Sequence, residues 1–93
     1  MTVTFKQARK IAREYRAKTW QPHEGTLYVA KEGYEDELGW LVVVGARELL
    51  VDDDERFMPN DDRVIVVDKT TGEVTELNMI FDTQRLEAMR PTK

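Results

Sequence analysis

A run of large apolar residues, Trp40-Leu41-Val42-Val43-Val44, constrains the fold of this chain more than any other feature of its sequence. β-branched and aromatic residues favour extended backbone, and a continuous apolar run is typical of a strand that is covered on both faces. The pattern predicts a central strand over residues 38–46. We expect Arg47 to Val51 to extend this strand through a bulge or bend. Trp40 is expected in the core, where it would anchor a helix to the sheet.

The N-terminal residues predict an amphipathic helix that begins at Phe5. Thr4 and Gln7 have the spacing of a capping box, in which each side chain binds a backbone amide that the first turn leaves unpaired. Apolar residues then recur at helical spacing on one stripe, and mostly basic residues occupy the remaining surface. Pro22 disfavours helical backbone just before it, so the helix should end near residues 17–19.

Three further strands and a short helix are expected. A short strand is expected to begin at Thr26 and to end at Lys31-Glu32-Gly33, and two more, over residues 64–67 and 73–77, flank a loop that ends at Gly72. Glycine supplies the positive φ that such a hairpin loop needs. Residues 82–89 predict a short helix capped by Asp82 that buries Leu86 and Met89. The acidic stretch after Val51 is expected to be an irregular loop.

The order of these elements predicts one α+β domain over residues 1–93. The length of 93 residues leaves room for a single small core. An N-terminal amphipathic helix packed on a four-stranded antiparallel sheet, with a short C-terminal helix, lets both the helix and the sheet cover their apolar sides.

Composition and motifs exclude several classes of function. The chain has no cysteine, which favours a reducing cytoplasm and excludes thiolate metal sites. It has one histidine, His23, and no glycine-rich phosphate loop, so neither a catalytic residue nor a cofactor nor a metal is indicated, and we expect no enzyme. The acidic pI of about 5.0 speaks against nucleic acid as a partner. The first residues lack the pattern of a signal peptide and no apolar run is long enough to span a membrane, so we expect neither a targeting segment nor a membrane anchor.

Charge is separated along the chain although its net value is only −4. Residues 1–20 carry six basic side chains and one acidic side chain, a balance of +5, so the remaining residues sum to −9. Residues 52–62 carry six acidic side chains and one basic side chain, a balance of −5. Such separation can steer an oppositely charged partner, and the alternative is that both blocks are solvated surface. An EF-hand is not indicated, because Arg56 and Phe57 occupy its fifth and sixth positions counted from Asp52.

Two segments resemble the immunity protein 35 family. They are Leu38-Gly39-Trp40-Leu41-Val42-Val43-Val44-Gly45-Ala46-Arg47-Glu48-Leu49-Leu50 and Val66-Val67-Asp68-Lys69-Thr70-Thr71-Gly72-Glu73-Val74. The amphipathic helix before them suits the family too. Where family members often carry Gly-Asn-any-Pro before the last hairpin, this chain reads Asp61-Asp62-Arg63-Val64. The resemblance implies a bacterial protein without catalytic residues that neutralises a toxin encoded beside it. Some relatives are suspected of chaperone-like roles.

These observations together predict a cytoplasmic binding protein that occludes a toxin, as a monomer or a homodimer. The acidic stretch would supply steering and rim contacts beside two apolar side chains. The alternative is a small chaperone or scaffold that uses exposed apolar surface. The expected partner-binding residues are Asp52, Asp53, Asp54, Glu55, Phe57, Met58, Asp61 and Asp62.

Overall fold

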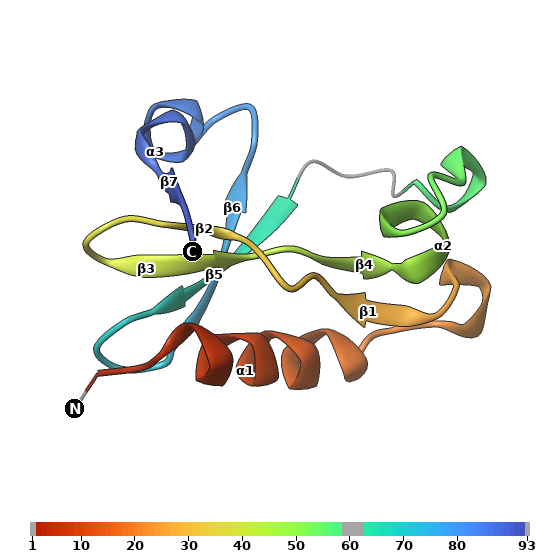
Figure 1. The fold of residues 1–93 in the computed structure, drawn as a ribbon, viewed down its shortest axis with the longest axis horizontal. Helices are drawn as coiled ribbons and strands as arrows, with labels where there is room; N and C mark the ends of the chain where they lie inside the picture. Colours follow the sequence, from red (N-terminus) through yellow and green to blue (C-terminus); the bar gives the residue numbers. More distant parts are fainter. Residues whose placement is uncertain (1, 59–62, 93) are drawn as a thin grey trace.

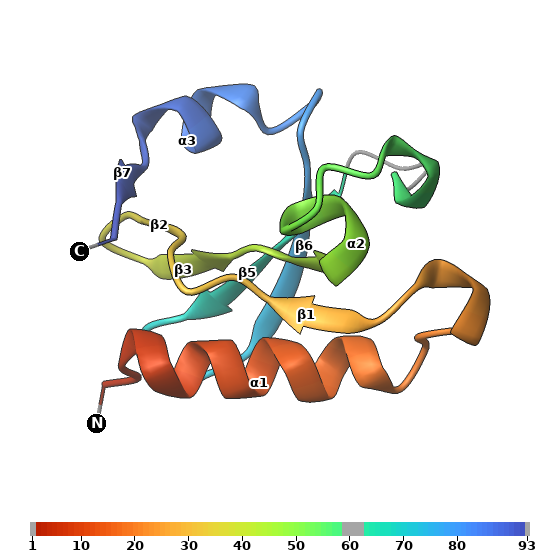
Figure 2. The same ribbon diagram turned by 45° about the vertical axis from the view of Figure 1, so that its right-hand side comes forward.

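The fold places an antiparallel sheet between an N-terminal helix and a C-terminal helix, as Figures 1 and 2 show. The computed structural model describes residues 2–58 and 63–92. The α-helices are α1 (Phe5–Ala17), α2 (Arg47–Leu50) and α3 (Thr83–Ala88), and two 3₁₀ helices are η1 (Pro22–Glu24) and η2 (Glu55–Phe57). The strands are β1 (Leu27–Val29), β2 (Tyr34–Glu35), β3 (Gly39–Val42), β4 (Val44–Ala46), β5 (Arg63–Asp68), β6 (Val74–Asn78) and β7 (Arg90–Pro91). The α+β class is confirmed.

Helix α1 has the start and the buried stripe that its sequence predicts. The Thr4 hydroxyl accepts a hydrogen bond from the amide of Gln7 at 3.2 Å, and the Gln7 side chain accepts one from the amide of Thr4 at 2.9 Å. Ala8 and Ala12 are fully buried against the sheet. Their small side chains let the helix backbone approach the strands closely.

The sheet is antiparallel as predicted, but the prediction of one sheet with four strands is wrong in the number of strands and sheets. In the described part of the chain, seven strands form two sheets, a five-stranded one in the order β6-β5-β3-β2-β7 and a two-stranded one made of β1 and β4. The apolar run is therefore divided at Val43, because β3 pairs with β5 and β4 pairs with β1. The strands β2 and β7 each contain two residues, too few to give an alternating pattern.

The expectation that Arg47 to Val51 extend the central strand is wrong, because Arg47–Leu50 form helix α2. The amide of Arg47 donates to the carbonyl of Thr26 at 2.8 Å, and the carboxylate of Glu48 accepts the amide of Thr26 at 2.9 and 3.0 Å. Arg, Glu and Leu have high helix propensity, so the chain turns once it reaches this anchor. The backbone hydrogen bond from Thr26 lowers the pKa of Glu48.

The β5–β6 hairpin and the C-terminal helix form near their predicted positions. Gly72 has a φ of 78° and ends the hairpin loop as expected. Met89 is buried and Leu86 is half-buried. Asp82 does not cap α3 with its side chain, because its carboxylate accepts the amide of Asn78 at 2.8 Å and so closes the turn before the helix.

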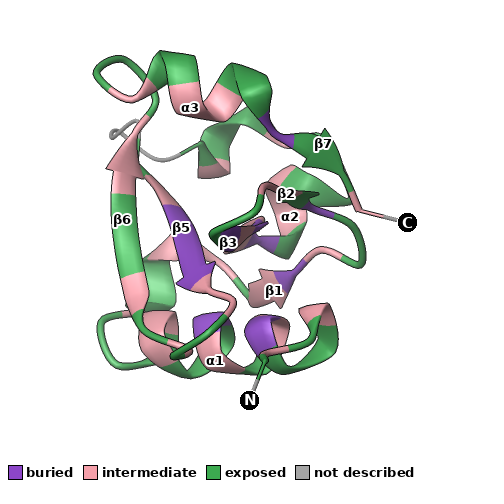
Figure 3. Ribbon diagram, turned by 90° about the vertical axis from the view of Figure 1, so that its left-hand side faces the viewer, coloured by how far each residue is buried: buried purple, intermediate pink, exposed green. Residues whose placement is uncertain are grey.

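Two apolar clusters lie on the two sides of the sheet. On the α1 side, Val42, Ile65 and Val67 pack with Ala8 and Ala12. On the α3 side, Leu41, Val66 and Met89 form a second cluster. Figure 3 shows buried residues in α1 and on the central strands between these layers.

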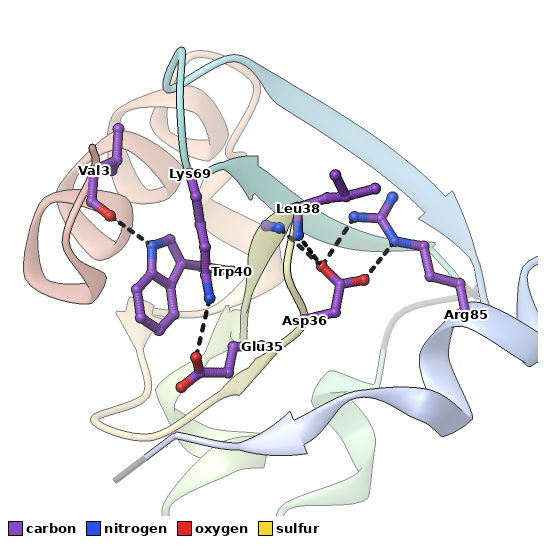
Figure 4. A network of polar contacts seen from close by, with 8 residues as sticks. Val3, Glu35, Asp36, Leu38, Trp40, Lys69 and Arg85 are labelled. Atoms are coloured by element: carbon purple, nitrogen blue, oxygen red, sulfur yellow. Dashed lines mark hydrogen bonds and ion pairs between the residues drawn. The ribbon is translucent and has the colours of Figure 1, made fainter. Parts of the chain in front are cut away.

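Trp40 is half-buried beside the first cluster and ties the N-terminal segment to the sheet. Its indole N–H donates to the carbonyl of Val3 at 2.8 Å, and its ring centroid lies 5.4 Å from that of Phe5. Lys69 Nζ lies 4.2 Å from the centre of the indole ring and pairs with Glu35 at 3.0 Å. Figure 4 shows this network together with the nearby pair of Asp36 and Arg85.

Candidate functional site

The acidic segment, residues 52–58, follows α2 and contains η2 at one end of the molecule (Figure 1). Backbone hydrogen bonds give it a defined shape. The amide of Asp54 donates to Glu48 O at 2.9 Å, and the amide of Phe57 donates to Asp54 O at 3.1 Å. Since Glu48 also binds Thr26, the segment is attached to the two-stranded sheet.

Three carboxylates of the segment face solvent. Asp52, Asp53 and Glu55 are exposed, and none forms a salt bridge with another described residue. Asp53 has a φ of 54°, a left-handed conformation that aspartate adopts more readily than most residues. These three side chains have the accessibility that the partner-binding prediction requires.

Asp54 differs from its neighbours because it is paired within the segment. Its carboxylate accepts the amide of Arg56 at 3.1 Å and binds the guanidinium of Arg56, with a shortest N–O distance of 2.7 Å. The hydrogen bond from the Arg56 side chain is the main cause of a lowered pKa for Asp54. Asp54 therefore caps η2 and is only half-exposed, so the segment presents fewer free charges than its sequence suggests.

The two apolar members of the segment have different surroundings. Met58 is 61% exposed, as a contact residue would be. Phe57 is half-buried, and its ring lies so close to Gly25 that a Cβ on that glycine would sit 2.9 Å from Phe57 Cδ1. Phe57 thus attaches the segment to the body of the protein. Asp61 and Asp62, the other two predicted residues, lie outside the described residues.

A cavity of about 590 Å³ borders the acidic segment and is lined by residues of β4 and β5, which belong to different sheets. Its apolar wall includes Leu41 of β3, Val64 of β5 and Val43, which lies between β3 and β4, and Phe57 and Met58 also line it. Several charged or ionisable residues line it as well, namely Arg16, His23, Glu24, Arg56, Arg63 and Glu76.

An exposed apolar turn between β6 and α3 was missed by the sequence reasoning. Met79, Ile80 and Phe81 are 53, 64 and 87% exposed. The side-chain oxygen of Asn78 accepts the amides of Ile80 and Phe81 at 2.8 and 3.2 Å, which fixes the turn. Three large apolar residues following an asparagine, without a helical or alternating continuation, were the available signal.

Within residues 2–58 and 63–92, no group of three or more His, Asp or Glu side chains is placed to hold a metal ion. No helix in these ranges has both the length and the apolar composition needed to cross a membrane.

Comparison of the chain with protein-family models, with curated proteins and with solved structures gave no match.

Proposed function

We propose that the protein is a cytoplasmic binding protein of the immunity type, which occludes a basic surface of a toxin encoded nearby and performs no catalysis. The observation that carries the proposal is the acidic segment, where Asp52, Asp53 and Glu55 are free and Met58 is exposed beside them. The resemblance of residues 38–50 and 66–74 to the immunity protein 35 family supports it. Neither nucleic acid nor membrane is a proposed partner.

The shape of the segment favours binding without a large ordering cost. Hydrogen bonds from Asp54 and Phe57 and the contact of Phe57 with Gly25 hold the backbone before any partner arrives. A preorganised loop loses less conformational entropy on binding than a flexible one. Exposed charges at the rim of an interface act mainly on the association rate, because they steer the encounter.

The test is association kinetics with the product of the neighbouring reading frame at low and high salt. We expect the triple variant Asp52→Asn, Asp53→Asn, Glu55→Gln to associate about tenfold more slowly at low salt and to lose most of its salt dependence. Asp54 is left unchanged, since it holds Arg56. The matched control neutralises three exposed carboxylates elsewhere, Glu32, Glu37 and Glu87, and should change the rate far less.

Two results would contradict the proposal. One is an association rate that is the same for parent, triple variant and control at both salt concentrations. The other is failure of the parent to restore growth when it is co-expressed with the toxic product of the neighbouring reading frame.

The second candidate function, a small chaperone or scaffold, is favoured by one observation, the exposed turn of Met79, Ile80 and Phe81. Exposed apolar patches mark surfaces that bind other apolar surfaces. A chaperone role predicts that the parent slows aggregation of a heat-unfolded client enzyme and that Ile80→Ser with Phe81→Ser abolishes this effect. The triple carboxylate variant should then protect the client as well as the parent does.

A further inference from the structure

Strand β6 is an open edge of the five-stranded sheet. Its residues Val74 to Asn78 pair with β5 in one continuous register, and no other strand of the described residues pairs with its outer side. Figure 3 shows β6 at the outer side of the sheet. It contains no proline and no bulge, two features by which natural edge strands avoid pairing with other chains, and its one charged side chain, Glu76, is engaged by Tyr15 and Arg63 of its own chain.

Two other edges are protected in ways that β6 is not. The opposite edge of the same sheet, β7, is two residues long and contains Pro91. Beside β1, the guanidinium of Arg9 donates to the carbonyls of Val29 and Ala30 at 3.1 and 2.9 Å. Arg9 thus occupies acceptors next to that edge. The contrast singles out β6 as an edge that is available for pairing.

The ladder with β5 determines which backbone groups of β6 point outward. The amide of Asp68 donates to Glu73 O at 2.9 Å, so this pair is hydrogen-bonded. Hydrogen-bonded pairs alternate along an antiparallel ladder, which assigns Thr75 and Leu77 to bonds with β5. The amides and carbonyls of Val74 and Glu76 therefore face away from the sheet.

We infer that β6 pairs with β6 of a second copy of this chain, antiparallel about a two-fold axis at Thr75. In this register Val74 lies opposite Glu76 of the second copy, so the outward groups of both residues can bond across the axis. Thr75 lies opposite Thr75 of the second copy in the non-hydrogen-bonded pair between them. Threonine pairs are favourable across strands.

Charge favours this register over the one with its axis at Glu76 and is compatible with a second copy as the occupant. No like charges face each other when the axis is at Thr75, because Glu76 faces valine and Glu73 faces Leu77. An axis at Glu76 would place two carboxylates face to face, which is unfavourable. Glu76 is also engaged on its own chain by the hydroxyl of Tyr15 at 3.1 Å and by Arg63 at 3.8 Å.

The register also accounts for the exposed turn after β6. In this register Asn78 lies opposite Gly72 of the second copy, so the turn at residues 79–81 would lie near the hairpin loop of that copy. The apolar side chains of Ile80 and Phe81 would then add buried area to a contact that backbone hydrogen bonds alone would make small.

The first test is the mass of the parent in solution as a function of concentration, by sedimentation equilibrium. We expect a reversible dimer. Thr75→Lys places two like charges opposite each other at the axis and should weaken the dimer at least about tenfold. Gln84→Lys adds the same charge on an exposed residue of α3 and should leave the dimer unchanged. Both variants keep the backbone bonds of β6 to β5, so their circular dichroism should match that of the parent.

The second test reads the register directly by disulfide formation. The chain has no cysteine, so Thr75→Cys introduces a single thiol per copy. Non-hydrogen-bonded pairs have Cα atoms about 4.5 Å apart, within the range that a disulfide spans. Mild oxidation should convert Thr75→Cys to a covalent dimer much faster than Gln84→Cys.

A parent that stays monomeric up to about 1 mM chain would overturn the inference. So would a dimer that Thr75→Lys leaves intact, or equal rates of disulfide formation for the two cysteine variants. None of these measurements involves the toxin or the acidic segment. Their failure is therefore separate from a failure of the proposed function.

Discussion

At the scale of single residues, Asp36 is a carboxylate whose ionisation is strongly coupled to folding. Arg85 Nε donates to it at 2.9 Å, and the amides of Leu38 and Gly39 donate to it at 2.9 and 2.8 Å. These bonds, that of Arg85 foremost, lower the pKa of Asp36 to about 2. Its side chain is only 20% exposed, so solvent screens the interaction incompletely.

Stability should therefore fall in acid as Asp36 is protonated. Because the pKa in the folded state is below the unfolded value of about 3.9, the interaction stabilises the protein above pH ~4 and is lost as the pH falls toward 2. We expect about 1 to 2 kcal/mol of unfolding free energy to disappear in this window. Urea unfolding between pH 2 and 5 checks this. Asp36→Asn should reduce the fall in unfolding free energy between pH ~4 and 2. Glu87→Gln, an exposed control, should leave that fall unchanged.

A second prediction at this scale separates the packing of the Trp40 ring from the hydrogen bond that its indole N–H donates to Val3. Trp40→Ala removes the ring that packs on Phe5 and carries Lys69, and should lower the unfolding free energy by about 3 kcal/mol. Trp40→Phe retains an aromatic ring but loses the hydrogen bond to Val3, which is worth about 1 kcal/mol. Urea melts of the two variants give the values. Coincident melts for parent and Trp40→Ala would show that the ring contributes nothing to the core.

At the scale of elements, the sequence predicted the helix and the hairpin that depend on neighbouring residues. It did not predict the strands whose bounds depend on pairing with residues far away in the sequence. The Thr4–Gln7 capping box and the φ of Gly72 are local, and α1 and the β5–β6 hairpin form as expected. The division of the apolar run at Val43 depends on β1 and β5, which pair with its two halves. Strand β7 exists because β2 pairs with it, and its own residues carry no strand pattern.

The hairpin provides a prediction for one element. Gly72 has a positive φ, so Gly72→Ala forces an alanine into a conformation that L-residues avoid and should cost about 1 kcal/mol of unfolding free energy. Gly45→Ala is the matched control. Its added methyl would lie 3.5 Å from Leu50 Cδ1, an ordinary contact in a strand, and should cost nothing or stabilise slightly. Thermal melts that shift equally for both variants would contradict the argument from φ.

At the scale of the whole molecule, the negative charge of the candidate site could be predicted from the sequence. The contacts that Asp54 and Phe57 make could not. The carboxylates of Asp52, Asp53 and Glu55 are exposed, and none forms an ion pair with another described residue. The pairing of Asp54 with Arg56 follows from the turn into η2, which the sequence did not indicate. The position of Phe57 depends on Gly25, far away in the sequence.

The molecule should unfold as one unit although it has two sheets. Trp20 lies beside the two-stranded sheet, where its indole N–H donates to Gly25 O at 2.8 Å, and Trp40 lies in the five-stranded sheet. Trp20→Phe and Trp40→Phe leave one tryptophan each, so the tryptophan fluorescence of each variant reports on one sheet. We expect its fluorescence melt to coincide with its own far-UV circular dichroism melt. Separate transitions within one variant would show that the sheets unfold independently.

The hydrogen bond from the amide of Val3 to the carbonyl of Lys69 has a consequence for synthesis. The ribosome makes Val3 and α1 first, but Val67 and Lys69, against which they are held, emerge much later. The apolar stripe of α1 must therefore remain uncovered while the intervening chain is made, at a translation rate of about 5–20 residues per second. The helix cannot reach its native packing until Val67 and Lys69 have been made. During that interval the nascent chain is most in need of protection from other chains.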